Sequence, residues 1–210
     1  MHLPEMALEE ALSHGECALC WLAHRNLLRR TETLLREHLA DPEWRASLRQ
    51  GSGFCSYHAD WMLRHGEVLP LAILAEDVLA HVEQWFSTKR HAPQRCQLCE
   101  AQGQDMAQFA HLLARLLDDA EWRGRYEQSA GLCVPHLQMV ARVCRRETKG
   151  WLIECERARW QALRLQLQEV IQKHDYRFKD VPWGEETGSW RRAFHKLYGT
   201  ALPEEASDER

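Results

Sequence analysis

Apolar residues recur every three or four positions along most of this chain, which is the spacing of one face of a helix. In the stretch after Cys20, arginines and glutamates separate the apolar positions, as in a helix with one solvated face. No stretch shows a sustained alternation of apolar and polar residues, the period of two that is typical of a strand. The pattern therefore predicts an all-α protein.

Capping and breaking residues divide this pattern into elements. Asp41 and Pro42 suit the start of a short helix, because Asp accepts hydrogen bonds from the free amides and Pro fits the first turn. That helix is expected to end at the glycines of 51–53. We expect further helices at 54–66, 68–87, 98–117, 120–128, 132–147, 150–173 and 188–198, with a loop over 180–189 and a frayed tail from Pro203.

The chain contains the same unit twice. Cys-x-x-Cys, Asp-x-Glu-Trp-Arg and Gly-x-Cys-x-x-His occur in this order from Cys17 to His58 and again from Cys96 to His136. The first matching cysteines lie 79 residues apart and the later matches lie 78 apart, so one deletion explains the difference. We predict duplicated helical units, each with a Cys3His metal knuckle, at 1–90 and 91–178. A loop, a short helix and a tail at 179–210 would complete one compact globule.

Composition narrows the classes of function. The net charge of −4 does not favour binding to nucleic acid or to anionic lipid. The acidic start of the chain and the charges that interrupt the most apolar stretch, 68–82, predict no export signal and no membrane span. We expect a cytoplasmic protein, in which eight cysteines indicate metal binding or redox chemistry before disulfides.

The repeated cysteines and histidines have the spacing of metal ligands. CxxC brings two thiolates together, and CxxH on a helix places both side chains on one face. His14 and His24 also lie near the first CxxC, but their counterparts, Pro93 and Gly103, cannot bind a metal. Because each repeat is expected to fold back as a helical hairpin, we predict one site per repeat. The first would consist of Cys17, Cys20, Cys55 and His58, and the second of Cys96, Cys99, Cys133 and His136.

Zinc, two ions per chain, is the predicted cofactor, and an iron–sulfur cluster on the same ligands is the alternative. Four protein ligands leave zinc no open position, so the metals are expected to hold the fold rather than perform catalysis. Cys144 and Cys155 fall outside the repeat and are expected to be buried structural thiols. Trp44 and Trp122 are expected to pack between the short helix and the knuckle rather than stack on bases.

An aromatic and charged segment follows the second repeat. We favour an ordered tail whose aromatic side chains dock on the helices. The alternative is a surface for a small ligand or a partner. Its candidate residues are His174, Asp175, Arg177, Arg191 and Arg192.

In combination, these motifs resemble those of a bacterial family of uncharacterised proteins that share a domain of unknown function. The resemblance rests on both CxxC motifs, on Gly-Phe-Cys-x-x-His and Gly-Leu-Cys-x-Pro-His, and on the segments Lys-His-Asp-Tyr-Arg-Phe and Gly-Ser-Trp-Arg-Arg. It covers the chain from about Cys17 to Tyr198. It implies membership of the family and no particular activity.

Three hypotheses of function follow. The first is a non-enzymatic zinc protein whose helices bind an unknown protein partner. Nucleic acid is a possible partner that the net charge does not favour, and no binding to membranes is expected. The second is a redox switch, because zinc-bound thiolates can oxidise and release the metal. The third and least favoured is an enzyme that uses the C-terminal His, Asp and Arg residues.

Overall fold

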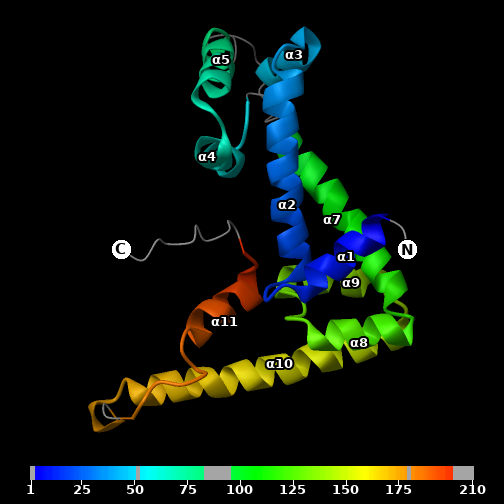
Figure 1. The fold of residues 1–210 in the computed structure, drawn as a ribbon, viewed down its shortest axis with the longest axis vertical. Coiled ribbons are helices and arrows are strands. Elements are labelled where there is room, and N and C mark those ends of the chain that lie inside the picture. The colour runs from blue at the N-terminus through cyan, green and yellow to red at the C-terminus, as the bar shows by residue number, and fades with distance from the viewer. Residues whose placement is uncertain (1–2, 51–52, 83–95, 179–180, 201–210) are drawn as a thin grey trace. The chain divides into compact units, whose positions relative to one another are not determined.

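The computed structural model describes residues 3–50, 53–82, 96–178 and 181–200, and the prediction of an all-α fold is confirmed there, since no strand occurs in these ranges (Figure 1). None of the described helices is long and apolar enough to cross a membrane. In chain order the elements are α1 (Leu3–Ser13), α2 (Ala18–Thr33), the π-helical turn η1 (Leu34–His38), α3 (Pro42–Gln50), α4 (Ser56–His65), α5 (Val68–Leu79), α7 (Gln97–Leu116), α8 (Ala120–Gln128), α9 (Val134–Val143), α10 (Arg146–Lys173), the 3-10 turn η2 (Tyr176–Phe178) and α11 (Ser189–Tyr198).

Many helix bounds agree with the sequence pattern, but several differ. The helix predicted at 132–147 ends at Val143, because Cys144 and Arg145 are extended and α10 begins directly after them. The helix α1 was not predicted, although Leu8, Ala11 and Leu12 form a buried face at helical spacing. The helix predicted at 68–87 ends at Leu79, because the chain turns at Ala80 and His81. The end of that predicted range and the tail from Pro203 lie outside the described residues.

The two repeats begin their short helices in the same way. Asp41 Oδ1 accepts hydrogen bonds from the backbone amides of Glu43 at 2.9 Å and Trp44 at 3.3 Å. Asp119 Oδ1 accepts the equivalent pair of bonds at 2.9 and 3.3 Å. Each aspartate therefore caps its helix as the sequence predicts.

The chain divides into two compact units, one made of Met1–Leu22 and Ala107–Arg210 and the other of Ala23–Met106. Helix α2 begins in the first unit and ends in the second, and α7 begins in the second and ends in the first. These boundaries differ from the predicted 1–90, 91–178 and 179–210. The division passes through two continuous helices, so no linker in the sequence marks it.

Each unit has its own apolar core. In the first unit α1 packs on α8, and α11 packs on α9 and α10 (Figure 1). The fully buried leucines of this unit include Leu113 and Leu132. In the second unit α3 packs on α5, where Asp77 pairs with Arg45 and Arg49 at 3.0 and 2.9 Å. These cores are what position the cysteines described next.

Candidate metal centres

The first cluster lies entirely within the first unit, where the starts of α2 and α9 meet. His136 Nδ1 lies 3.4 Å from the sulfurs of both Cys17 and Cys20 and 3.2 Å from Cys133 Sγ. The sulfurs of Cys20 and Cys133 are 3.8 Å apart. All four candidate ligand atoms lie within 4.8 Å of one another, so together they could hold a metal ion.

The second cluster lies entirely within the second unit, where the starts of α4 and α7 meet. His58 Nδ1 lies 3.2 Å from Cys55 Sγ, 3.5 Å from Cys96 Sγ and 3.3 Å from Cys99 Sγ. The sulfurs of Cys55 and Cys99 are 3.5 Å apart. This cluster has the same composition and the same spacing as the first.

The eight predicted residues therefore converge, but the predicted pairing is wrong. Each CxxC meets the CxxH of the other repeat. The reason is helix length: α2 and η1 together are about 30 Å long, whereas α3, with nine residues, is only about 13 Å long and cannot span the length of α2. Cys55 instead lies beside the start of α7, where its sulfur is 3.5 Å from Cys99 Sγ.

The nearby histidines are not part of either cluster, as the repeat predicts. His14 stacks on Trp21 with ring centroids 4.3 Å apart, and His24 is buried and stacks on Trp61. Cys144 and Cys155 also lie outside both clusters. They are half-buried rather than buried, which corrects the expectation for these thiols.

Of the two matched tryptophans, Trp44 contacts the metal knuckle as expected. Trp44 Nε1 donates to Gln97 Oε1 at 3.1 Å, and Gln97 Nε2 donates to Ser47 Oγ at 2.6 Å. Because Gln97 lies inside the second CxxC, these bonds attach α3 to the second cluster. Trp122 is buried and packs under the guanidinium of Arg125.

The electrostatics of both clusters favour partial ionisation. Burial raises the pKa of the Cys96 thiol, but the hydrogen bond from His58 and backbone amides outweighs it and lowers the pKa to about 6. Burial and the nearby sulfur of Cys55 raise the pKa of Cys99 to about 12. Burial lowers the pKa of His136, but bonds with Cys133 and Cys17 raise it to about 10. Three thiolates this close repel one another, and a divalent cation is the group that offsets such repulsion.

A buried carboxylate anchors the CxxH turn of the first cluster. Glu156 is fully buried and accepts from the amide of Leu132 at 3.1 Å and from the hydroxyl of Tyr126 at 2.5 Å. It also pairs with Arg159 at 3.1 Å and Lys196 at 2.6 Å. The sequence gives no specific signal for this role, since Glu156 is one of many acidic residues on a long polar helix.

Gly131, which precedes this turn, has no room for a side chain. Its φ of +73° lies in the left-handed region, and an added Cβ would lie directly against Glu156 Oε1. We expect Gly131→Ala to lower the free energy of unfolding by about 2–4 kcal/mol, from backbone strain and displacement of the buried carboxylate. Urea denaturation of the metal-loaded protein measures this change.

Two other glycines provide matched controls for that substitution. Gly53 has a similar φ of +79°, but its added Cβ would meet only Val78 at an ordinary distance of 3.8 Å. Gly53→Ala should therefore cost only about 1 kcal/mol. Gly150→Ala, on an open face of α10, should stabilise the protein by up to about 1 kcal/mol. Equal losses for Gly131→Ala and Gly53→Ala would contradict the role of Glu156.

The end of α11 covers the first cluster, a feature that the sequence did not predict. An added Cβ on Gly199, which has a φ of +81°, would lie 3.5 Å from the sulfurs of both Cys20 and Cys133. The amide of Thr200 donates to Cys20 Sγ at 3.5 Å. Backbone therefore closes over these sulfurs, and bonds of this kind stabilise a metal-bound thiolate.

The two clusters differ in exposure. In the first, Cys20 and Cys133 are 3% and 1% exposed. In the second, His58 and Cys96 are buried, but Cys99 is exposed to solvent. Cys17 in the first cluster and Cys55 in the second are partly exposed, so Cys99 is the most accessible sulfur of the two clusters.

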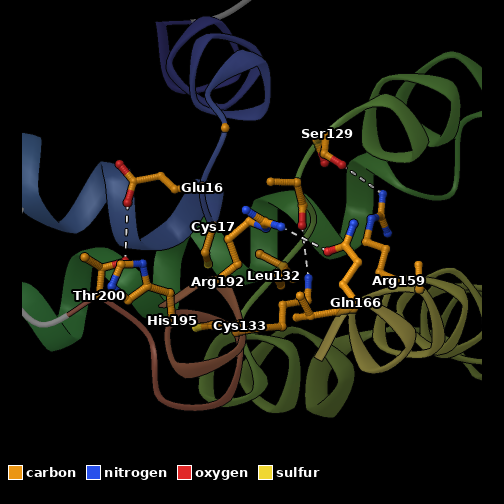
Figure 2. Close-up of a pocket in the computed structure, with 15 residues that line it drawn as sticks. Glu16, Cys17, Ser129, Leu132, Cys133, Arg159, Gln166, Arg192, His195 and Thr200 are labelled. Atoms are coloured by element: carbon orange, nitrogen blue, oxygen red, sulfur yellow. Dashed lines mark hydrogen bonds between the residues drawn. The ribbon is translucent and has the colours of Figure 1, made fainter. Parts of the chain in front are cut away.

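The C-terminal candidate surface does not form one site. Asp175 pairs with Arg177 at 2.6 Å, and His174 Nδ1 contacts the carbonyl of Val170 at 2.9 Å. Arg191 lies over the ring of Trp190. Of the five predicted residues only Arg192 lines the cavity beside the first cluster, shown in Figure 2.

The neighbouring charges of this segment hold its loop in place. Lys173 Nζ contacts Glu186 Oε1 and the carbonyl oxygen of Pro182, both at 2.7 Å, and it faces the ring of Trp183. Glu186 is buried and also accepts from the amide of Gly184 at 2.9 Å. The bond from Lys173 and that amide lower the pKa of Glu186 to about 2. These contacts support the interpretation of the segment as an ordered tail.

Comparison with known proteins yields one family. The model of a family of unknown function, DUF6062, matches residues 2–94 and residues 80–204. No curated protein and no solved structure matches the chain.

Proposed function

The chain belongs to the family of unknown function DUF6062, and we propose that it is a zinc-binding helical protein with two structural Cys3His sites. The observation that carries this proposal is the convergence of all eight repeated ligands into two clusters of the same composition. Convergence of this kind twice in one chain is not expected of unrelated buried cysteines.

The separations within the clusters fit a tetrahedral zinc ion. With zinc bonds of ~2.3 Å to sulfur and ~2.05 Å to nitrogen, a tetrahedron has edges of about 3.8 Å between sulfurs and about 3.6 Å between sulfur and nitrogen. The sulfurs of Cys20 and Cys133 are 3.8 Å apart and those of Cys55 and Cys99 are 3.5 Å apart, and the sulfur–nitrogen distances run from 3.2 to 3.5 Å. The agreement within a few tenths of an ångström supports a single central ion.

The same spacing disfavours the iron–sulfur alternative. A cluster of several iron and sulfide atoms separates its protein ligands more widely than one ion does, whereas all ligand atoms here lie within 4.8 Å. Four protein ligands also close a zinc site against substrate or activated water. A structural role is therefore favoured over catalysis at the metal.

Metal analysis of protein purified without oxygen tests the proposal. We expect about two zinc ions per chain and no visible absorption, because zinc has a filled d shell. A coloured protein with stoichiometric iron, or a protein without bound metal that keeps its full helical content, would overturn it.

The exposed face of α11 supports a protein partner. Trp190, Phe194, Leu197 and Tyr198 recur at helical spacing and are each at least half exposed. A contiguous exposed apolar face of this kind is characteristic of interaction surfaces. With a net charge of −4, the chain favours protein over nucleic acid as the partner. Retention on immobilised nucleic acid that falls with rising salt would instead favour the alternative.

The exposure of Cys99 favours a redox switch as the second candidate function. Peroxide would oxidise the Cys99 thiolate to a sulfenic acid, with release of hydroxide. Attack by the Cys55 thiolate, whose sulfur lies 3.5 Å away, would then form a disulfide, release water after proton uptake and set the zinc ion free. Two electrons pass from the two thiolates to one peroxide.

Dilute peroxide should therefore empty the second cluster several-fold faster than the first, because the sulfurs of Cys20 and Cys133 are covered. Zinc release measured with a chromophoric chelator, with mass spectrometry of the new disulfide, follows both reactions in one sample. The first cluster is the internal control. Equal rates of release, or no release at all, would exclude the switch.

A further inference from the structure

A cavity of about 370 Å³ lies beside the first cluster, with all its lining residues in the first unit (Figure 2). Four segments surround it: the residues just before α2, the loop before α9, one face of α10, and one face of α11 with Thr200 after it. Cys17 and Cys133 of the cluster contribute to its wall. Its volume is within the range of small-molecule sites.

The apolar part of the wall is contributed by two elements. Leu132, next to the cluster, is fully buried, and Ala162 and Leu163 lie on the facing side of α10. A small ring or short alkyl group would remove the surface of Ala162 and Leu163 from water, since Leu132 is already buried. Cys17 lines the same cavity as these apolar residues, so a ring or alkyl group bound there would lie beside the half-exposed sulfur of Cys17.

The charged part of the wall has one cation that lacks a carboxylate partner. Arg159 and Lys196 both pair with Glu156. Arg192 instead donates to neutral oxygens: the carbonyls of Thr187 and Glu185 at 2.8 Å and Gln166 Oε1 at 3.0 Å. Within the described part of the chain, Arg192 makes no ion pair.

His195 is the second polar group available to a ligand. It lies one turn of α11 from Arg192 and lines the same cavity. Its ring makes no hydrogen bond or ion pair within the residues that the structure describes. Arg192 and His195 together offer donors to an anion, while Glu16, the acidic residue of the wall, is engaged by the hydroxyl of Thr200 at 3.4 Å.

We propose that this cavity binds a small organic carboxylate, with the carboxylate at Arg192 and His195 and the apolar end against Leu132 and Leu163 beside Cys17. A monoanion fits the charges better than a dianion, since three cations are offset by two carboxylates and three thiolates on one zinc ion carry a net negative charge. The cations are Arg159, Lys196 and Arg192, and the carboxylates are those of Glu156 and Glu16. The negative charge of the thiolates also sets the orientation of the ligand. Its carboxylate lies at Arg192 and His195, away from the thiolates, and its uncharged end lies beside Cys17. The negative charge assigned to the cluster depends on the proposed zinc site, whereas the cavity and its cations are independent of that proposal.

Calorimetric titration of the zinc-loaded full chain tests this proposal with benzoate, benzamide and phenyl phosphate as probes. We expect benzoate to bind at least tenfold more tightly than the neutral benzamide and more tightly than the dianionic phenyl phosphate. Arg192→Gln and His195→Gln should each weaken benzoate binding about tenfold, as expected for the loss of a charge-assisted hydrogen bond. The control Arg191→Gln, a neighbour on α11 outside the cavity lining, should bind benzoate as the unaltered protein does.

A second measurement needs no variant. Benzoate should slow the alkylation of Cys17 by iodoacetamide, followed by peptide mass spectrometry, and should leave the rate at Cys99 unchanged. Equal affinity for benzoate and benzamide, tighter binding of phenyl phosphate, or an equal effect of Arg191→Gln would overturn the proposal. Zinc content, measured on the same samples, reports separately on the metal sites, so failure of one proposal does not imply failure of the other.

Discussion

Serine substitution of Cys20 together with Cys133 is expected to leave about one zinc ion per chain, as is Cys20→Ser alone. Both residues belong to the first cluster, so the second substitution removes a ligand from a site that is already lost. Cys20→Ser with Cys55→Ser should instead leave almost no zinc, because it damages both clusters. Native mass spectrometry resolves the three stoichiometries.

This comparison separates the two pairings directly. If each site lay within one repeat, the combination of Cys20 and Cys55 would keep one zinc ion, and the combination of Cys20 and Cys133 would lose both. Cys144→Ser with Cys155→Ser is the control, since these thiols lie outside both clusters and should not change the zinc content. The opposite result for the two ligand pairs would refute the exchange of CxxH motifs between repeats.

Removal of both metals by a strong chelator, under reducing conditions, is expected to abolish most of the cooperative structure. A structural zinc ion contributes on the order of 10–16 kcal/mol in small peptides. A whole domain is stable by only ~5–15 kcal/mol, so loss of this contribution outweighs the rest. Circular dichroism should show a large loss of helical signal that returns when zinc is added back.

The second unit should lose its structure first. Its cluster includes the exposed Cys99, whereas Gly199 and Thr200 cover the sulfurs of the first cluster. Hydrogen exchange followed by mass spectrometry would assign the order, with α4 losing protection before α9. A chelator already saturated with zinc is the control. A full helical signal after complete removal of metal would show that the leucine cores alone hold the fold.

Much of this protein could be predicted from its sequence because the signals are local. Helical periodicity and the caps at Asp41 and Asp119 depend on residues close together in the chain, and the choice of eight ligands over His14 and His24 depends on comparing the two repeats. The duplication strengthened each of these inferences, since a local signal that occurs twice in register is not accidental. Helix α1 was missed although its pattern is of the same kind, because its buried face is short.

The tertiary structure decided which ligands meet. The sequence pattern is the same whether each CxxC pairs with its own CxxH or with that of the other repeat, so spacing cannot distinguish the two arrangements. The outcome depends on the lengths of α2 and α3 and on the unit in which each helix ends. The cover over Cys20 and the buried partner of Leu132 were likewise decided by packing, since Thr200 and Glu156 are distant in sequence from the groups they contact.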